Sequence, residues 1–239
     1  MSRQESEKWL IDQLLLVLVV YPAGLVLGTI CLGLRLMGNI QVVGLEYLWA
    51  QRSPLILVSN HPSLLEVVLL PLFFLHRCWW NPWRIPWSTP DLKNYGYWWA
   101  WLRPRAIFVR RGESRAQFQA LVRAKGVLQT GGDLIVFPEG GRTCSGNCHL
   151  TSEQGKRLRP LKEGVSWLAK ETGVPVVPVW VEGTDAVLPN KAGRLYHCLP
   201  SFWGKKITII FGPPIHFDCQ LSRQHITRLI EEHLLVLAD

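Results

Sequence analysis

The segment from Leu14 to Leu34 contains no charged residue, and it limits the possible folds more than any other part of the 239-residue chain. An uncharged apolar run of roughly 20 residues is long enough to span a membrane as a helix. However, Pro22 and three glycines interrupt the run, and a proline inside a helix kinks or breaks it. We therefore predict two short helices that bend within one leaflet rather than one straight span, and we assign residues 1–38 to a hydrophobic membrane anchor.

Two other interpretations of the run are weaker. A secretory signal is disfavoured because residues 3–8 mix both signs of charge and no A-x-A cleavage site follows. A buried core helix is disfavoured because such helices are usually shorter and apolar on one side.

Composition agrees with a folded protein that meets a lipid surface. Hydrophobic residues make up 48% of the chain and charged residues 18%, which excludes intrinsic disorder because ample apolar surface offsets chain entropy. The net charge of +8 suits an anionic partner: a nucleic acid, an anionic membrane or a phosphorylated substrate. Together, the apolar run and the twelve tryptophans favour the membrane over nucleic acid, because tryptophan is enriched at membrane interfaces.

Many of the tryptophans lie in one short, proline-containing stretch. They are Trp79, Trp80, Trp83, Trp87, Trp98, Trp99 and Trp101. So dense a group would struggle to provide a buried hydrogen-bond partner for every indole N–H. We predict a partly exposed interfacial patch beside the N-terminal helices.

The six cysteines are scattered, and we interpret them as reduced thiols. The only cluster, Cys144-x3-Cys148-His149, lacks the usual zinc spacing and a second ligand pair, so no metal site is predicted.

From residue 39 onward the pattern is that of an α/β domain. The expected strands are residues 54–59, 106–109, 134–137, 174–181 and 207–211, and the expected helices are residues 115–129, 164–171 and one that opens at His61-Pro62-Ser63. Alternation of strands and helices predicts a mostly parallel central sheet flanked by helices, which we assign to residues 39–239.

The segment Asn60-His61-Pro62-Ser63-Leu64-Leu65-Glu66 carries the clearest chemical signal. On an ideal helix, residues five apart point about 140° away from each other. His61 and Glu66 can therefore meet only if His61 precedes the helix. Glu66 would then hold one imidazole nitrogen while the other takes a proton. This predicts a general base that acts on a substrate hydroxyl or amine.

Two further segments could bind phosphate. In Phe137-Pro138-Glu139-Gly140-Gly141-Arg142-Thr143, the glycines let backbone N–H groups approach a ligand, and Arg142 can fork onto phosphate oxygens. A structural turn is an equally good interpretation of this segment alone. The paired arginines at the end of Arg103–Arg111 could also bind phosphate, or could form a solvated basic edge.

Together and in this order, the segments resemble the glycerolipid acyltransferase family, the lysophosphatidate (1-acylglycerol-3-phosphate) acyltransferases. The resemblance covers residues 40–216 and rests on Asn60-His61 through Glu66, Phe108-Val109-Arg110-Arg111, Phe137 through Thr143, Lys162-Glu163-Gly164, Val174-Pro175-Val176-Val177-Pro178-Val179 and Gly212-Pro213-Pro214-Ile215. Three positions depart from the family pattern: Glu66 replaces Asp, Arg105 replaces Gly and Gly141 replaces Thr.

The resemblance implies a membrane enzyme of phospholipid biosynthesis, with its catalytic domain on the cytoplasmic face. It would move a fatty acyl group from acyl-CoA or acyl-carrier protein to a lysophospholipid hydroxyl, most simply that of 1-acylglycerol-3-phosphate. His61 would be the general base and Glu66 its orienting carboxylate. The implied substrate-binding residues are Arg111, Glu139, Gly140, Gly141, Arg142 and Lys162.

No metal or bound cofactor is implied, and the expected partners are membrane lipids and the acyl donor, not nucleic acid. Two alternatives stay open. The acceptor could be another lysolipid or an amine-bearing lipid, or the chain could be a catalytically inert membrane-binding homologue.

Overall fold

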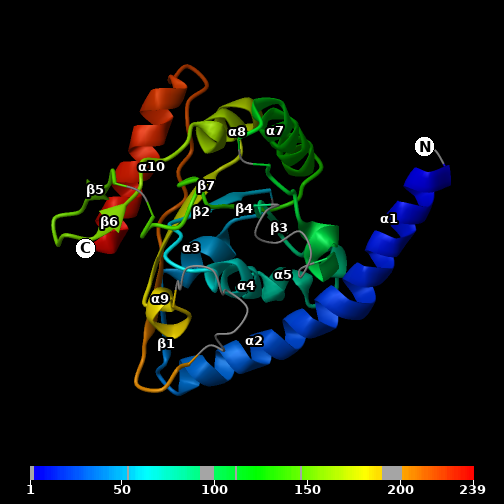
Figure 1. Ribbon diagram of the computed structural model, residues 1–239, viewed down its shortest axis with the longest axis horizontal. Helices are drawn as coiled ribbons and strands as arrows, with labels where there is room; N and C mark the ends of the chain where they lie inside the picture. The colour runs from blue at the N-terminus through cyan, green and yellow to red at the C-terminus, as the bar shows by residue number, and fades with distance from the viewer. Residues whose placement is uncertain (1–2, 53, 92–99, 111, 146, 190–200) are drawn as a thin grey trace.

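A computed structural model describes residues 3–52, 54–91, 100–110, 112–145, 147–189 and 201–239 (Figure 1). Its centre is a six-stranded sheet in the order β1-β8-β7-β2-β4-β3. The strands are β1 (Ile40–Val43), β2 (Ile56–Ser59), β3 (Trp87–Ser88), β4 (Leu134–Val136), β7 (Val176–Glu182) and β8 (Ile207–Phe211). Of the pairs in this sheet, β7 with β8 is antiparallel and the others are parallel. The predicted mostly parallel α/β sheet is confirmed.

Helices cover both faces of the sheet. On one face lie α7 (Ser114–Gln129), α8 (Gly164–Thr172) and α10 (Arg223–Ala238), and on the other lie α3 (Leu45–Ala50), α4 (Glu66–Leu72) and α5 (Leu75–Cys78). In β2, Ile56 and Val58 pack toward the first group, whereas Leu57 packs toward the second. Burial on both faces explains why this strand is a continuous apolar run in the sequence.

The N-terminal segment is one continuous helix, so the prediction of two short helices is wrong. It consists of α1 (Arg3–Leu15), a π-helical turn η1 (Leu16–Val20) and α2 (Tyr21–Leu36). In the π turn, the Tyr21 N–H bonds to the Leu16 carbonyl, one residue further back than in an α-helix. Pro22 follows as one of the first residues of α2, where the wider turn accommodates a residue that lacks an N–H.

Most of this helix runs along the domain, and the N-terminal part of α1 projects beyond it (Figure 1). Near its N-terminal half it contacts η2 (Pro82–Arg84) and η3 (Ala100–Arg105), and α2 contacts α4, α5 and β1. Cys31 of α2 belongs to the same core cluster as the sheet residue Leu57.

Three tryptophans of the predicted patch are exposed, whereas Trp87 is half-buried and packs against the core. Trp79, Trp80 and Trp83 are 54%, 91% and 55% exposed. The Tyr21 hydroxyl donates to the Trp79 carbonyl at 2.5 Å, and the Trp83 indole donates to Gln13 Oε1 at 2.7 Å. The predicted position beside the N-terminal helix is therefore confirmed for Trp79 and Trp83. Trp98, Trp99 and the Trp101 side chain lie outside the described residues.

The strand expected at residues 106–109 is reduced to isolated bridges. Ile107 and Val109 donate to the carbonyls of Ser88 and Pro90, at 2.8 and 2.9 Å. Pro90 has no N–H with which to return a bond, so the ladder stays incomplete.

Candidate active site

The candidate catalytic segments meet at the carboxyl ends of two neighbouring parallel strands. His61 follows the end of β2, and Phe137-Pro138-Glu139 follows the end of β4, which pairs with β2. In open α/β sheets, ligands bind outside this edge.

Ser63 and Glu66 set where α4 begins. The Ser63 N–H donates to Glu66 Oε1 at 2.8 Å, and the Ser63 hydroxyl accepts from the Leu65 N–H at 3.1 Å. These two bonds fold the turn that precedes α4 and use backbone donors that the helix itself does not pair. The helix begins at Glu66, with Leu65 as its N-cap, and not at Pro62 as predicted. His61 stands outside the helix, as the angular argument required.

His61 and Glu66 approach each other in a nearly closed site. Their exposed fractions are 7% and 0%, and His61 Nδ1 lies 3.4 Å from Glu66 Oε2. The contact has ion-pair distance but is longer than a well-formed hydrogen bond, and among the described residues neither atom has a hydrogen-bond partner. Such contacts are often long without substrate and tighten when it binds. The Phe137 ring, 4.6 Å from the imidazole between centroids, supports the other side of His61.

Glu139 is buried and fully engaged by the chain itself. Its Oε1 accepts from the His61 N–H at 2.6 Å and the Thr143 hydroxyl at 2.7 Å, and its Oε2 accepts from the Arg159 N–H at 3.0 Å. Burial raises the pKa of Glu139, whereas these donors act in the opposite direction. With both oxygens occupied, Glu139 holds the loops of the site in place. Its role in substrate binding stays a prediction.

Gly140 and Gly141 make room for two cationic side chains. Gly140 has a φ of +66°, and a Cβ there would lie 2.4 Å from Lys162 Cε. A Cβ on Gly141 would lie 2.1 Å from Arg159 Nη1. A side chain at position 141 would therefore displace the guanidinium of Arg159 from its present place. Arg159, which also donates to the Ser145 hydroxyl at 3.0 Å, lies outside the recognisable motifs, and the sequence offered it only with Lys156 and Arg157 as an alternative phosphate site.

The remaining predicted arginines differ in what the structure says of them. Arg142 is half-buried on the loop after β4. The next residue, Thr143, joins this loop to His61, because its N–H donates to the His61 carbonyl at 2.8 Å. Arg111 lies outside the described residues. Its neighbour Arg110 pairs with Glu113 at 3.8 Å on the surface.

The comparisons with known proteins agree with this geometry. Residues 39–182, more than half of the chain, match the family described as Acyltransferase. The chain belongs to this acyltransferase family.

Several curated relatives are named 1-acyl-sn-glycerol-3-phosphate acyltransferases. A chloroplastic protein of Brassica napus is 30% identical over 65% of this chain and 41% of its own length. A chloroplastic protein of Arabidopsis thaliana is 28% identical over 74% of this chain and 44% of its own, and a Saccharomyces cerevisiae protein is 28% identical over 65% and 46%. The acyltransferase thus spans less than half the length of these relatives.

A solved structure shares the fold. The crystal structure of the 1-acyl-sn-glycerophosphate acyltransferase of Thermotoga maritima superposes with a TM-score of 0.58 and 22% identity, covering 84% of this chain and 72% of that one.

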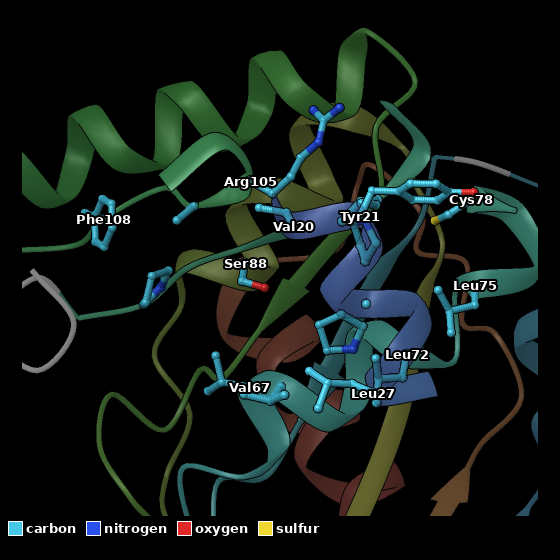
Figure 2. Close-up of a pocket in the computed structure, with 17 residues that line it drawn as sticks. Val20, Tyr21, Leu27, Val67, Leu72, Leu75, Cys78, Ser88, Arg105 and Phe108 are labelled. Carbon is cyan, nitrogen blue, oxygen red and sulfur yellow. The ribbon is translucent and has the colours of Figure 1, made fainter. Parts of the chain in front are cut away.

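Two cavities of the acyltransferase are lined by residues adjacent in sequence to the site: Val67 lines one, and Pro138 and Gly140 line the other. The first is apolar and lies between the N-terminal helix and α4 and α5, as Figure 2 shows. It begins at Val67 and Phe108, near Glu66, and reaches Cys78, Ile85 and Arg105. The second lies between α7, α8 and the end of β4, and Gly140 and Lys162 line its mouth. Within the described part of the chain, no cluster of three His, Cys, Asp or Glu side chains could hold a metal ion.

Proposed function

We propose that this protein transfers a fatty acyl group from acyl-CoA or acyl-carrier protein to the hydroxyl of a lysophospholipid, with 1-acylglycerol-3-phosphate as the favoured acceptor. The observation that carries the proposal is the buried His61–Glu66 pair at the end of β2, 3.4 Å between Nδ1 and Oε2. The nearby hydroxyls of Ser59, Ser63 and Thr143 are each engaged in hydrogen bonds within the chain. The proposal therefore takes the nucleophile from the substrate.

In the proposed reaction, the acceptor hydroxyl attacks the thioester carbonyl directly. His61 Nε2 takes the hydroxyl proton as the carbon–oxygen bond forms, while the Glu66 carboxylate stabilises the imidazolium. When the tetrahedral intermediate collapses, the carbon–sulfur bond breaks and the imidazolium returns the proton to the departing thiolate. The products are the diacyl lipid and free CoA or carrier-protein thiol.

The acceptor phosphate would lie near the Gly140-Gly141 turn. Lys162 and Arg159 cover these glycines, and Arg142 follows them on the same loop. Charge-assisted contacts of this kind are about twice as strong as neutral hydrogen bonds. Arg111, placed at the phosphate by the resemblance, stays a proposal.

The acyl chain of the donor would occupy the apolar cavity of Figure 2. This cavity starts at Val67, the residue after Glu66, so a chain lying in it would leave its thioester close to His61. Its walls are apolar side chains of α4 and of the N-terminal helix, among them Leu27 and Leu72.

Membrane association is proposed from the outer face of the N-terminal helix. The helix Glu7–Leu36 is long and apolar enough to cross a membrane by length and composition. Its exposed apolar residues are Trp9, Leu10, Ile11, Leu14, Leu18, Val19, Val26, Ile30, Leu32 and Leu36. Because the other side of the helix packs along the domain, we propose that it lies in the plane of one leaflet. The cytoplasmic leaflet is proposed because soluble acyl donors are found there.

The test is an acyl-transfer assay with purified protein across a panel of lysolipids and acyl donors, read by mass spectrometry. We expect a diacyl product that His61→Ala abolishes. Vesicle binding without transfer to any acceptor would instead support the inert homologue.

A further inference from the structure

We propose that Thr184 is a positioning residue of the acyltransferase, which selects the carboxylate oxygen that Glu66 presents to His61. This inference rests on the proposed function. Thr184 begins the short helix α9 (Thr184–Val187), directly after β7, and lies outside every segment singled out in the sequence.

The contact between Thr184 and Glu66 is direct. The Thr184 hydroxyl donates to Glu66 Oε1, and the same oxygen accepts from the Ser63 N–H at 2.8 Å. Glu66, Ser63 and Thr184 are all 0% exposed. Two donors therefore hold Oε1, and Oε2 is the oxygen that remains for His61 Nδ1.

The backbone around β7 leaves Thr184 little freedom. The Asn60 side chain exchanges two hydrogen bonds with the Val181 backbone, at 2.8 and 2.7 Å, so the loop of His61 and the end of β7 are joined. Gly183 then turns the chain with a φ of +82°, and a Cβ there would lie 2.1 Å from the Lys206 carbonyl oxygen. The turn accepts only glycine, and it brings the next residue against Glu66.

A buried carboxylate needs this kind of restraint. Its two oxygens offer several acceptor sites, and rotation of the carboxylate would exchange the oxygen that faces His61. A hydroxyl on Oε1 removes that freedom and supplies a charge-assisted bond at a fully buried carboxylate. Glu66 also spans three partners at once: Ser63, Thr184 and His61. An aspartate, one methylene shorter, would have to give up some of this reach.

The decisive variant is Thr184→Val, which keeps the shape and removes the hydroxyl. We expect kcat to decrease about 10- to 100-fold, the range of one hydrogen bond to a charged group. The KM values for donor and acceptor should stay within about twofold, because Thr184 touches neither substrate. Thr184→Ser should restore most of the activity. Thr184→Ala serves if the valine variant does not fold.

Thr227→Val is the matched control. Thr227 is a buried threonine of α10 whose hydroxyl bonds the Ser166 hydroxyl at 2.5 Å. Thr227→Val should lower the free energy of unfolding without a change in kcat. When Glu66→Gln is already present, adding Thr184→Val should lower kcat by less than about threefold. Positioning through a carboxylate has no effect once the carboxylate is gone. Unchanged kcat in Thr184→Val, or losses that multiply in the double variant, would overturn the proposal.

A spectroscopic readout separates this inference from the proposed function. Nitrogen NMR of the imidazoles, with His61→Gln used to assign the signal, should show one His61 tautomer protonated at Nδ1 in the wild type and a mixture in Thr184→Val. Identical His61 signals in both proteins would overturn the positioning role. A wild type that acylates no lysolipid would refute the proposed function alone.

Discussion

The backbone N–H of His61 donates to Oε1 of Glu139 at 2.6 Å, across 78 residues of sequence. This bond joins the loop after β2 to the loop after β4, and the return bond from the Thr143 N–H to the His61 carbonyl closes the connection. The histidine and the glycine-arginine turn are therefore one rigid unit. A substrate hydroxyl at His61 and a phosphate at the turn would be held at a constant separation.

The dyad gives the first prediction. His61→Ala should abolish transfer, and Glu66→Gln should lower kcat about 10²- to 10³-fold, because an amide cannot stabilise the imidazolium. Glu66→Asp should keep measurable activity. Glu66→Gln should also unfold at a lower denaturant concentration, since the buried carboxylate accepts hydrogen bonds from the Ser63 N–H and the Thr184 hydroxyl. Steady-state kinetics with circular dichroism as the folding control is the measurement, and a wild-type kcat in Glu66→Gln would refute the dyad.

The second prediction concerns the acceptor phosphate. Arg142→Ala and Arg159→Ala should each raise the KM for a phosphate-bearing lysolipid more than the KM for the donor, and lysine at either position should rescue only partly because it lacks the guanidinium fork. Arg157→Ala is the control, since Arg157 is exposed and lies two residues before Arg159 in the sequence. If the acceptor KM stays constant in both alanine variants, the phosphate binds elsewhere.

The third prediction is that Arg105 limits acyl-chain length. Its stem closes the far end of the apolar cavity, while its guanidinium points away from it, lies over the Trp87 ring at 5.0 Å and donates to the Trp83 carbonyl at 2.9 Å (Figure 2). Burial lowers the pKa of Arg105 to about 10, so the group is still charged at neutral pH. On the other side of Arg105 lies a third cavity, of about 420 Å³, which Arg105 also lines.

Arg105→Ala should join the two cavities and shift donor preference toward longer chains. Competition between acyl donors of increasing length, read by mass spectrometry, measures the shift. Arg84 is exposed and lines only the third cavity, so Arg84→Ala should leave the donor preference unchanged. The same product distribution in wild type and Arg105→Ala would place the acyl chain outside this cavity.

The fourth prediction tests the membrane-facing side of the N-terminal helix. Leu18 and Val26 are 69% and 62% exposed, and changing both to lysine should weaken vesicle binding more than about tenfold, because each apolar side chain contributes roughly 1.5–3 kcal/mol when buried. Val236→Lys, on the exposed face of α10, should bind vesicles like the wild type. Vesicle sedimentation gives the comparison, and equal binding by all three proteins would assign attachment to Trp79, Trp80 and Trp83 instead.

The sequence by itself determined the features that follow from local geometry. Apolar runs such as residues 54–59 are strands because burial on both faces leaves no polar position in them. The placement of His61 before the helix follows from the helical angle between His61 and Glu66 alone. The order of the segments was enough to indicate the family.

Only the tertiary structure decided the features that depend on residues far apart in the chain. Thr184 reaches Glu66 because β7 pairs with β2, and Arg159 covers Gly141 because the β5–β6 hairpin (Leu150–Thr151 and Arg157–Leu158) returns the chain to the site. The N-terminal helix is unbroken at Pro22 because the π-helical turn before it accommodates a residue that has no backbone N–H. Each of these features depends on contacts between groups that are far apart in the sequence, and a local sequence pattern does not predict such contacts.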